Sequence, residues 1–189
     1  MVLTYLSISL SSISLAQSPA YSIQGQVKKV INSNSKSQFP LVGTLSSGDK
    51  IEISVFQAEL IVSTIHLNLK KQIAKQYLDA NSEVSIFEYD FDNDGVNEII
   101  VEHNGKSDPL GFTRIVEVFK YSGGLSERVG FLISGQNECV IDKNTIHFPR
   151  VNSQGDIGST YVFQKEAFYR LEYENPALAE KNYWNPKKQ

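Results

Sequence analysis

The sequence predicts a mainly β fold, an antiparallel β sandwich or an open barrel, with one amphipathic helix at about residues 68–80. Segments rich in β-branched and aromatic residues recur about every ten residues, and turn formers such as Ser-Gly separate them. The composition of the 189 residues, 41% hydrophobic and 11% aromatic, is that of a globular chain that can bury a sizeable core. No linker, repeat or low-complexity segment divides the chain, so we expect residues 17–189 to form a single β domain.

The first half of the chain contains short segments in which apolar and polar residues alternate, as in strands with one buried face. These expected strands lie at 21–30, 41–45 and 51–55, and a β-rich but ambiguous segment follows at 59–67. The next segment differs, because its apolar residues recur at helical spacing among lysines. These residues are Leu69, Ile73, Ala74, Tyr77 and Leu78. They predict the amphipathic helix, and Asn81-Ser82 would end it.

The second half of the chain predicts strand after strand. The expected strands lie at 84–89, 97–103, 113–121, 130–133, 138–141, 145–148, 161–164 and 167–174. The last two should form a hairpin around Lys165-Glu166. Cys139 lies on one of these strands and is expected to be a small buried apolar residue. Because it is the only cysteine, the chain can form no intrachain disulfide.

Residues 1–16 are expected to be an export signal. They contain no charged side chain, and Ser14-Leu15-Ala16 places small residues at the −3 and −1 positions of a cleavage site before Gln17. The segment lacks the usual Lys or Arg at its start, and the alternative is a buried first strand. It is too short and too rich in Ser to predict a stable membrane span. Export without disulfides or glycosylation acceptors indicates a bacterial protein that is periplasmic or secreted.

The overall charge argues against one large class of partners. The formal net charge is −3 and the isoelectric point is about 5.6. Proteins that bind nucleic acid usually carry a basic stripe. We therefore expect no nucleic-acid partner.

The most informative motif is an acidic loop at 90–98, Asp-Phe-Asp-Asn-Asp-Gly-Val-Asn-Glu. Oxygen ligands at alternating positions of a tight turn suit a hard cation such as Ca²⁺, and the glycine permits the sharp turn. The expected ligands are the carboxylates of Asp90, Asp92, Asp94 and Glu98 and the backbone carbonyl of Val96. Seven acidic side chains and no Lys or Arg lie between 83 and 102, so a cation would relieve their repulsion. The alternative is a solvated acidic turn, since Asp, Asn and Gly are common turn formers.

The pattern Asp-x-Asp-x-Asp-Gly-x-x-Glu between two strands resembles the calcium loops of FG-GAP (integrin-α-like) and VCBS repeats. The resemblance covers about residues 84–102. The loop is not an EF-hand, because the twelfth position counted from Asp90 is Val101 and the flanking segments are expected strands. FG-GAP repeats usually build propellers, and the chain is too short for more than a couple of blades, so we do not expect a full propeller. The resemblance implies a small secreted bacterial β domain with one structural calcium ion.

The expected function is that of an exported, non-enzymatic, calcium-binding module for an unidentified protein or glycan. Some similar small domains are periplasmic lysozyme inhibitors or immunity proteins, so the alternative is inhibition of a peptidoglycan-cleaving hydrolase such as lysozyme. Several inhibitor families carry a Ser-Gly-x-x-Tyr loop, and the two candidate loops, 122–126 and 134–138, lack the Tyr. A third hypothesis, an enzyme that uses the acidic loop as a catalytic metal site, lacks a base, nucleophile or oxyanion device beside the loop. The scattered His66, His103 and His147 predict no zinc site, so no catalytic residue is expected.

Overall fold

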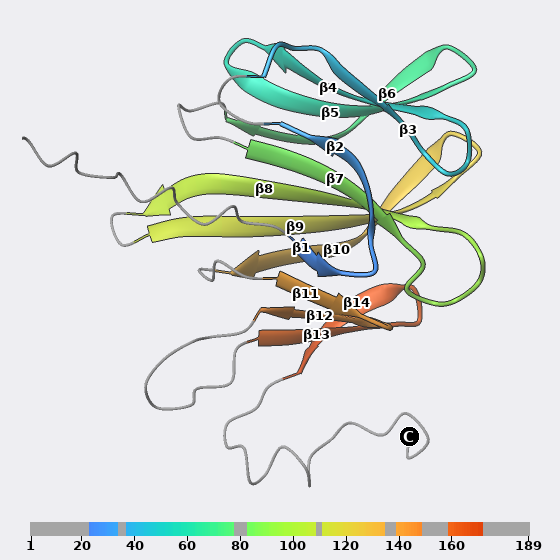
Figure 1. Ribbon diagram of the computed structural model, residues 1–189, viewed down its shortest axis with the longest axis vertical. Helices are drawn as coiled ribbons and strands as arrows, with labels where there is room; N and C mark the ends of the chain where they lie inside the picture. Colours follow the sequence, from blue (N-terminus) through green and yellow to red (C-terminus); the bar gives the residue numbers. More distant parts are fainter. Residues whose placement is uncertain are drawn as a thin grey trace, which may run out of the picture.

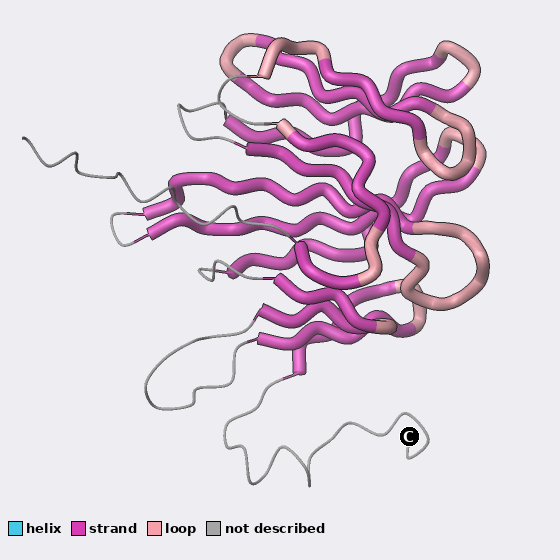
Figure 2. The backbone as a smooth tube through the Cα atoms, in the orientation of Figure 1, coloured by secondary structure: helices cyan, strands magenta, loops and turns pink. Residues whose placement is uncertain are grey.

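The computed structural model describes residues 23–33, 37–77, 83–108, 111–134, 139–148 and 159–171. These residues form fourteen strands, and no helix occurs among them (Figure 1 and Figure 2). The mainly antiparallel β character expected from the sequence is confirmed. The expected export signal, residues 1–16, lies outside the described residues.

The strands form three sheets, which we call upper, middle and lower after their places in Figure 1. The upper sheet contains β3 (Leu41–Thr44), β4 (Lys50–Phe56), β5 (Glu59–His66) and β6 (Leu69–Tyr77). The middle sheet contains β2 (Lys28–Asn32), β7 (Glu83–Tyr89), β8 (Glu98–Asp108), β9 (Gly111–Ser122) and β10 (Leu125–Ser134). The lower sheet contains β1 (Ile23–Gly25), β11 (Cys139–Asp142), β12 (Thr145–Phe148), β13 (Ser159–Gln164) and β14 (Ala167–Leu171). Each sheet therefore contains four consecutive strands in up-and-down order.

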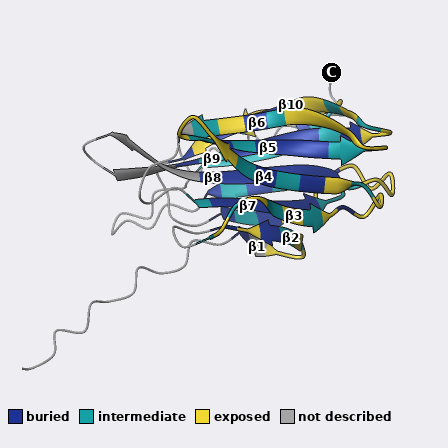
Figure 3. Cartoon of the chain, turned by 90° about the horizontal axis from the view of Figure 1, so that it is seen from above, coloured by how far each residue is buried: buried dark blue, intermediate teal, exposed yellow. Residues whose placement is uncertain are grey.

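The middle sheet is buried on both faces, so the fold has three β layers instead of the two of a simple sandwich. In β8, Ile99 and Val101 pack into a core shared with the upper sheet, and Ile100 between them packs into a second core shared with the lower sheet. All three side chains are fully buried, and buried residues run through the stacked strands in Figure 3. This two-sided burial explains why residues 99–101 of β8 are consecutive apolar residues without alternation.

The two short strands at the start of the described chain connect the lower and middle sheets. β1 pairs in parallel with β11, and β2 pairs antiparallel with β7. Gly25, at the end of β1, has a φ of +124°, and a Cβ atom there would lie 2.2 Å from the carbonyl oxygen of Ile141. Only glycine fits this approach of two backbones.

The predicted helix at about 68–80 is wrong, because residues 69–77 form strand β6. The two residues before it, Leu67 and Asn68, both have positive φ and close a tight β5–β6 hairpin. A β-bulge then places Ile73 as an extra residue, so that Ala74 faces Val62 across the pair. The bulge breaks the two-residue period of the strand and mimics helical spacing. The end of the expected helix, residues 78–80, lies outside the described residues.

Two expectations in the second half are confirmed. The hairpin around Lys165-Glu166 forms between β13 and β14. Cys139 is a free cysteine buried at the start of β11, and burial raises the pKa of its thiol to about 12.

The connections β3–β4, β5–β6, β7–β8 and β9–β10 all lie at the same end of the sheets, on the right in Figure 1. The acidic loop is one of them, since it joins β7 to β8. This placement brings side chains from several sheets close to the loop.

Candidate metal centre

The acidic loop closes a hairpin in the middle sheet. Tyr89, at the end of β7, pairs with Glu98, at the start of β8, so residues 90–97 form the connection. Phe91 is buried in the core between the middle and lower sheets, where it makes edge-on ring contacts with Tyr89 and Phe168. Its ring centroid lies 5.0 Å from that of Phe168. The second residue of the loop is therefore a hydrophobic anchor that holds the start of the loop against the core.

The aspartates of the loop are oriented by its own backbone. Asp90 accepts hydrogen bonds from the N–H groups of Asp94 (3.1 Å) and Gly95 (2.9 Å). The carboxylate of Asp94 accepts one from the N–H of Val96 at 2.7 Å. Asn93 and Gly95 have φ values of +58° and +87°, a conformation that Asn and Gly adopt more readily than other residues. The turn chemistry expected from the sequence is thus present.

Three carboxylates converge at the base of the loop. One oxygen atom from each of Asp90, Asp92 and Glu98 lies within 4.8 Å of the other two. Asp90 and Asp92 come from the loop, and Glu98 is the first residue of β8. These groups are hard oxygen ligands at a mutual spacing that a single Ca²⁺ ion can bridge.

Glu98 is the most unusual member of this group because its side chain is fully buried. Its Oε2 accepts a hydrogen bond of 2.9 Å from the N–H of Phe91, whereas its buried Oε1 accepts none from any described residue. Burial, with the nearby charges of the loop aspartates, raises the pKa of Glu98 to about 7, although the Phe91 hydrogen bond opposes the shift. A buried carboxylate oxygen without a partner costs free energy that a bound cation would recover.

The five ligands expected from the sequence are not all in this group. Asp94 is more exposed than Asp92, and Val96 has an exposed side chain, so that position offers a ligand only through its backbone. The structure places Lys120 from β9 beside the loop, with its Nζ 3.3 Å from Oδ2 of Asp92. Neither this lysine nor the anchoring role of Phe91 has a signal in the local sequence, because both depend on packing between strands and sheets.

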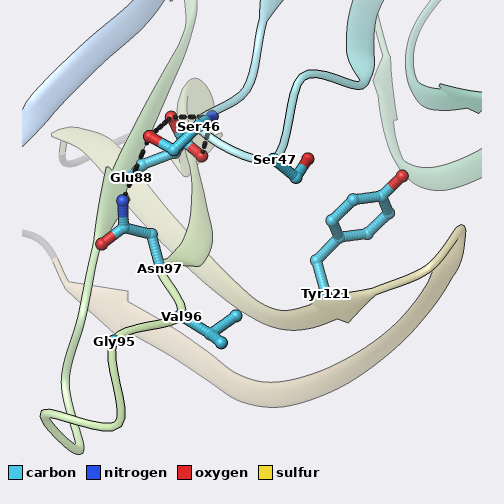
Figure 4. A pocket seen from close by; sticks show the side chains of 7 residues that line it. All are labelled: Ser46, Ser47, Glu88, Gly95, Val96, Asn97 and Tyr121. Carbon is cyan, nitrogen blue, oxygen red and sulfur yellow. Dashed lines mark hydrogen bonds between the residues drawn. The ribbon is translucent and has the colours of Figure 1, made fainter.

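A hollow of about 200 Å³ lies beside the loop, between the upper and middle sheets (Figure 4). Glu88 of β7 lies in its wall, is nearly fully buried, and accepts hydrogen bonds from the backbone N–H of Ser46 and from Lys28. Asn97 of the acidic loop donates a further bond to Oγ of Ser46 at 3.2 Å. These contacts fasten the β3–β4 loop to the acidic hairpin, and the Glu88 carboxylate is saturated by them.

The histidines in the described residues lie in separate places and each has a partner. His66 lies 2.9 Å from Asp49, which also accepts a hydrogen bond from Tyr121. The hydrogen bond from Tyr121 and then that from His66 lower the pKa of Asp49.

The other two histidines are in the middle and lower sheets. His103 lies 3.1 Å from the buried Glu117, and His147 lies 2.8 Å from Thr160. Burial favours a raised pKa for Glu117, but its hydrogen bonds with His103 and Arg128 outweigh that effect and lower the pKa. No histidine belongs to the carboxylate group among the described residues.

Of the two loops considered for an inhibitor role, the structure describes one in full. Residues 122–126 form a tight β9–β10 turn around Gly123-Gly124, and residues 135–138 of the other loop lie outside the described residues. A two-residue turn offers little length for insertion into an enzyme cleft.

No helix in the described part of the chain is long and apolar enough to cross a membrane. Searches of family models, curated proteins and solved structures find no match to this chain.

Proposed function

We propose that this protein is an exported calcium-binding β domain, in which one Ca²⁺ ion stabilises the acidic hairpin and the domain acts as a non-enzymatic binding module. The observation that carries the proposal is the buried Oε1 of Glu98, which has no hydrogen-bond partner among the described residues. It belongs to the group of carboxylates formed with Asp90 and Asp92.

The donor set favours calcium over other common ions. Three carboxylates and, as the sequence suggests, Asp94 and the carbonyl of Val96 would supply only oxygen ligands. Ca²⁺ accepts six to eight such ligands in flexible geometry, whereas Mg²⁺ requires a regular octahedron and retains several waters. A loop that holds its aspartates through backbone hydrogen bonds needs little rearrangement to bind the larger ion.

The architecture supports the resemblance to FG-GAP and VCBS repeats. Each sheet contains a run of four consecutive up-and-down strands, which is the plan of a propeller blade, and the acidic loop joins the first two strands of the middle run. Three such runs are fewer than the four to eight blades of closed propellers. An ion at the loop would stiffen one end of the central layer, the end where the connections of three sheets meet.

Calcium should raise the melting temperature of the folded chain, because an ion that binds only the folded state stabilises it by mass action. At a free concentration one hundred times the dissociation constant, the gain is about 2.7 kcal/mol. For a protein of this size it corresponds to roughly 5 to 10 °C. The measurement is a thermal melt in millimolar CaCl₂, in the same concentration of MgCl₂, and in EGTA.

Asp92→Asn should abolish most of this difference, since it removes a carboxylate from the group of three. Asp142→Asn is the matched control, because it makes the same charge change at an exposed residue of β11 outside the group. Identical melts of the unaltered chain in EGTA and in CaCl₂ would refute the proposal. A calcium effect that Asp142→Asn reduces as much as Asp92→Asn would show that the ion acts through general charge and not at this site.

A further inference from the structure

Lys120 reaches the acidic loop from the neighbouring strand β9. Its Nζ donates a hydrogen bond to Oδ2 of Asp92 at 3.3 Å and lies 3.7 Å from Oδ2 of Asp94. The same ammonium group donates to Oε1 of Glu166, at the β13–β14 turn of the lower sheet, at 3.4 Å. The positive charge of Lys120 therefore lies between the aspartates of the acidic loop and Glu166 of the lower sheet.

The ammonium group lies against a carboxylate that the metal ion would use. Lys120 contacts Oδ2 of Asp92, and Oδ1 of the same carboxylate accepts a hydrogen bond from the N–H of Asp94. A divalent ion and an ammonium group a few ångströms apart repel each other. Both cannot bind Asp92 closely at the same time.

We propose that Lys120 is an internal cation that competes with Ca²⁺ for Asp92 and so sets the affinity of the acidic loop. The inference rests on the calcium site proposed above. Without metal, Lys120 neutralises part of the charge on the loop. When the ion binds, the ammonium group moves away from Asp92 and keeps its contact with Glu166, which is largely exposed and free to follow it.

Calcium titration calorimetry on the full chain tests the proposal with matched variants. Lys120→Met keeps the aliphatic side chain and removes the charge, and it should tighten calcium binding roughly tenfold. Lys120→Arg keeps the charge and should bind calcium within about twofold of the unaltered protein. Lys165→Met removes the same charge from an exposed residue of the β13–β14 turn, where solvent screens it, and should change affinity by no more than about twofold.

The Glu166→Gln variant tests whether Glu166 holds the ammonium group of Lys120 when the ion displaces it from Asp92. Glu166 is the ion-pair partner of Lys120 outside the loop among the described residues, so its loss should weaken calcium binding by roughly threefold. A melt of each variant in EGTA shows that it is folded before the titration.

The outcomes separate this inference from the proposed function. Equal calcium affinity in the unaltered protein and in Lys120→Met would overturn the competition but leave the calcium site standing. Equal tightening by Lys120→Met and Lys165→Met would also overturn it, since general electrostatics would then account for the effect. Absence of calcium binding in every protein would refute both.

Discussion

Replacement of Glu98 by glutamine should stabilise the metal-free protein at alkaline pH and abolish its stabilisation by calcium. Glutamine has nearly the same shape and can still accept the hydrogen bond from the N–H of Phe91. It carries no charge to bury and no second carboxylate oxygen for an ion. The same substitution therefore acts in opposite directions with and without metal.

The size of the metal-free effect follows from the pKa of Glu98. That pKa is about 7 in the folded protein and about 4.5 in the unfolded chain. Between these values the folded state holds a proton that the unfolded state has lost, so the free energy of unfolding decreases as the pH rises through this window. At about 1.4 kcal/mol per pH unit, the decrease reaches about 3 kcal/mol above pH 7. The Glu98→Gln variant would not incur this loss, because the amide does not titrate.

The assay is urea denaturation of both proteins in EGTA at about pH 5 and pH 8, repeated at pH 8 with calcium. The difference in unfolding free energy should be below about 1 kcal/mol at the lower pH and should favour the glutamine variant by about 3 kcal/mol at the higher one. Taking the difference between the unfolding free energies of the two proteins cancels the contributions of other titrating groups. One of these is Glu102, whose pKa is also raised to about 7 by burial. Glu59→Gln, at a partly exposed ion pair, is the control and should show little dependence on pH. A difference that is the same at both pH values would refute the reasoning.

Three further substitutions or modifications test the fold. Gly25→Ala should lower the free energy of unfolding by at least about 3 kcal/mol in chemical denaturation, because it forces a Cβ against the carbonyl of Ile141. Gly48→Ala is the control: it also has a positive φ but open space around it, and should cost only about 1 kcal/mol. Glu117→Gln should cost about 3 kcal/mol at neutral pH, because it weakens the hydrogen bonds of this buried carboxylate with His103 and Arg128. Cys139 should react with a thiol reagent only on unfolding, and rapid labelling of the native protein would contradict its burial.

The central layer of the fold could be predicted from the sequence because its signals are local. The apolar runs on either side of the acidic loop are β7 and β8, and the turn residues at Lys165-Glu166 join the last two described strands. The number of layers has no local signal. It depends on pairings between distant segments, such as the parallel contact of β1 with β11, which lie far apart in the chain.

The incorrect helix shows how an irregular strand misleads pattern analysis. The hairpin turn before β6 consists of Leu67 and Asn68, and it contains no glycine to mark the two positive φ values. The bulge at Ile73 then shifts the pairing register by one residue, so that Ala74 is buried opposite Val62. A strand with one extra residue places apolar side chains three or four positions apart, which is also the spacing of a helix.

The candidate site divides in the same way between local and long-range information. The aspartates, the glycine and Glu98 lie within one short loop and its first strand residue, so their spacing predicts a cation loop directly. The groups that would set its affinity come from elsewhere: Lys120 from β9 and Glu166 from the lower sheet. A loop of identical sequence in another chain, with a neutral residue at the position of Lys120, should therefore bind calcium more tightly. The motif predicts that a cation binds, and under the competition proposed for Lys120 the strands packed around the loop would determine how strongly.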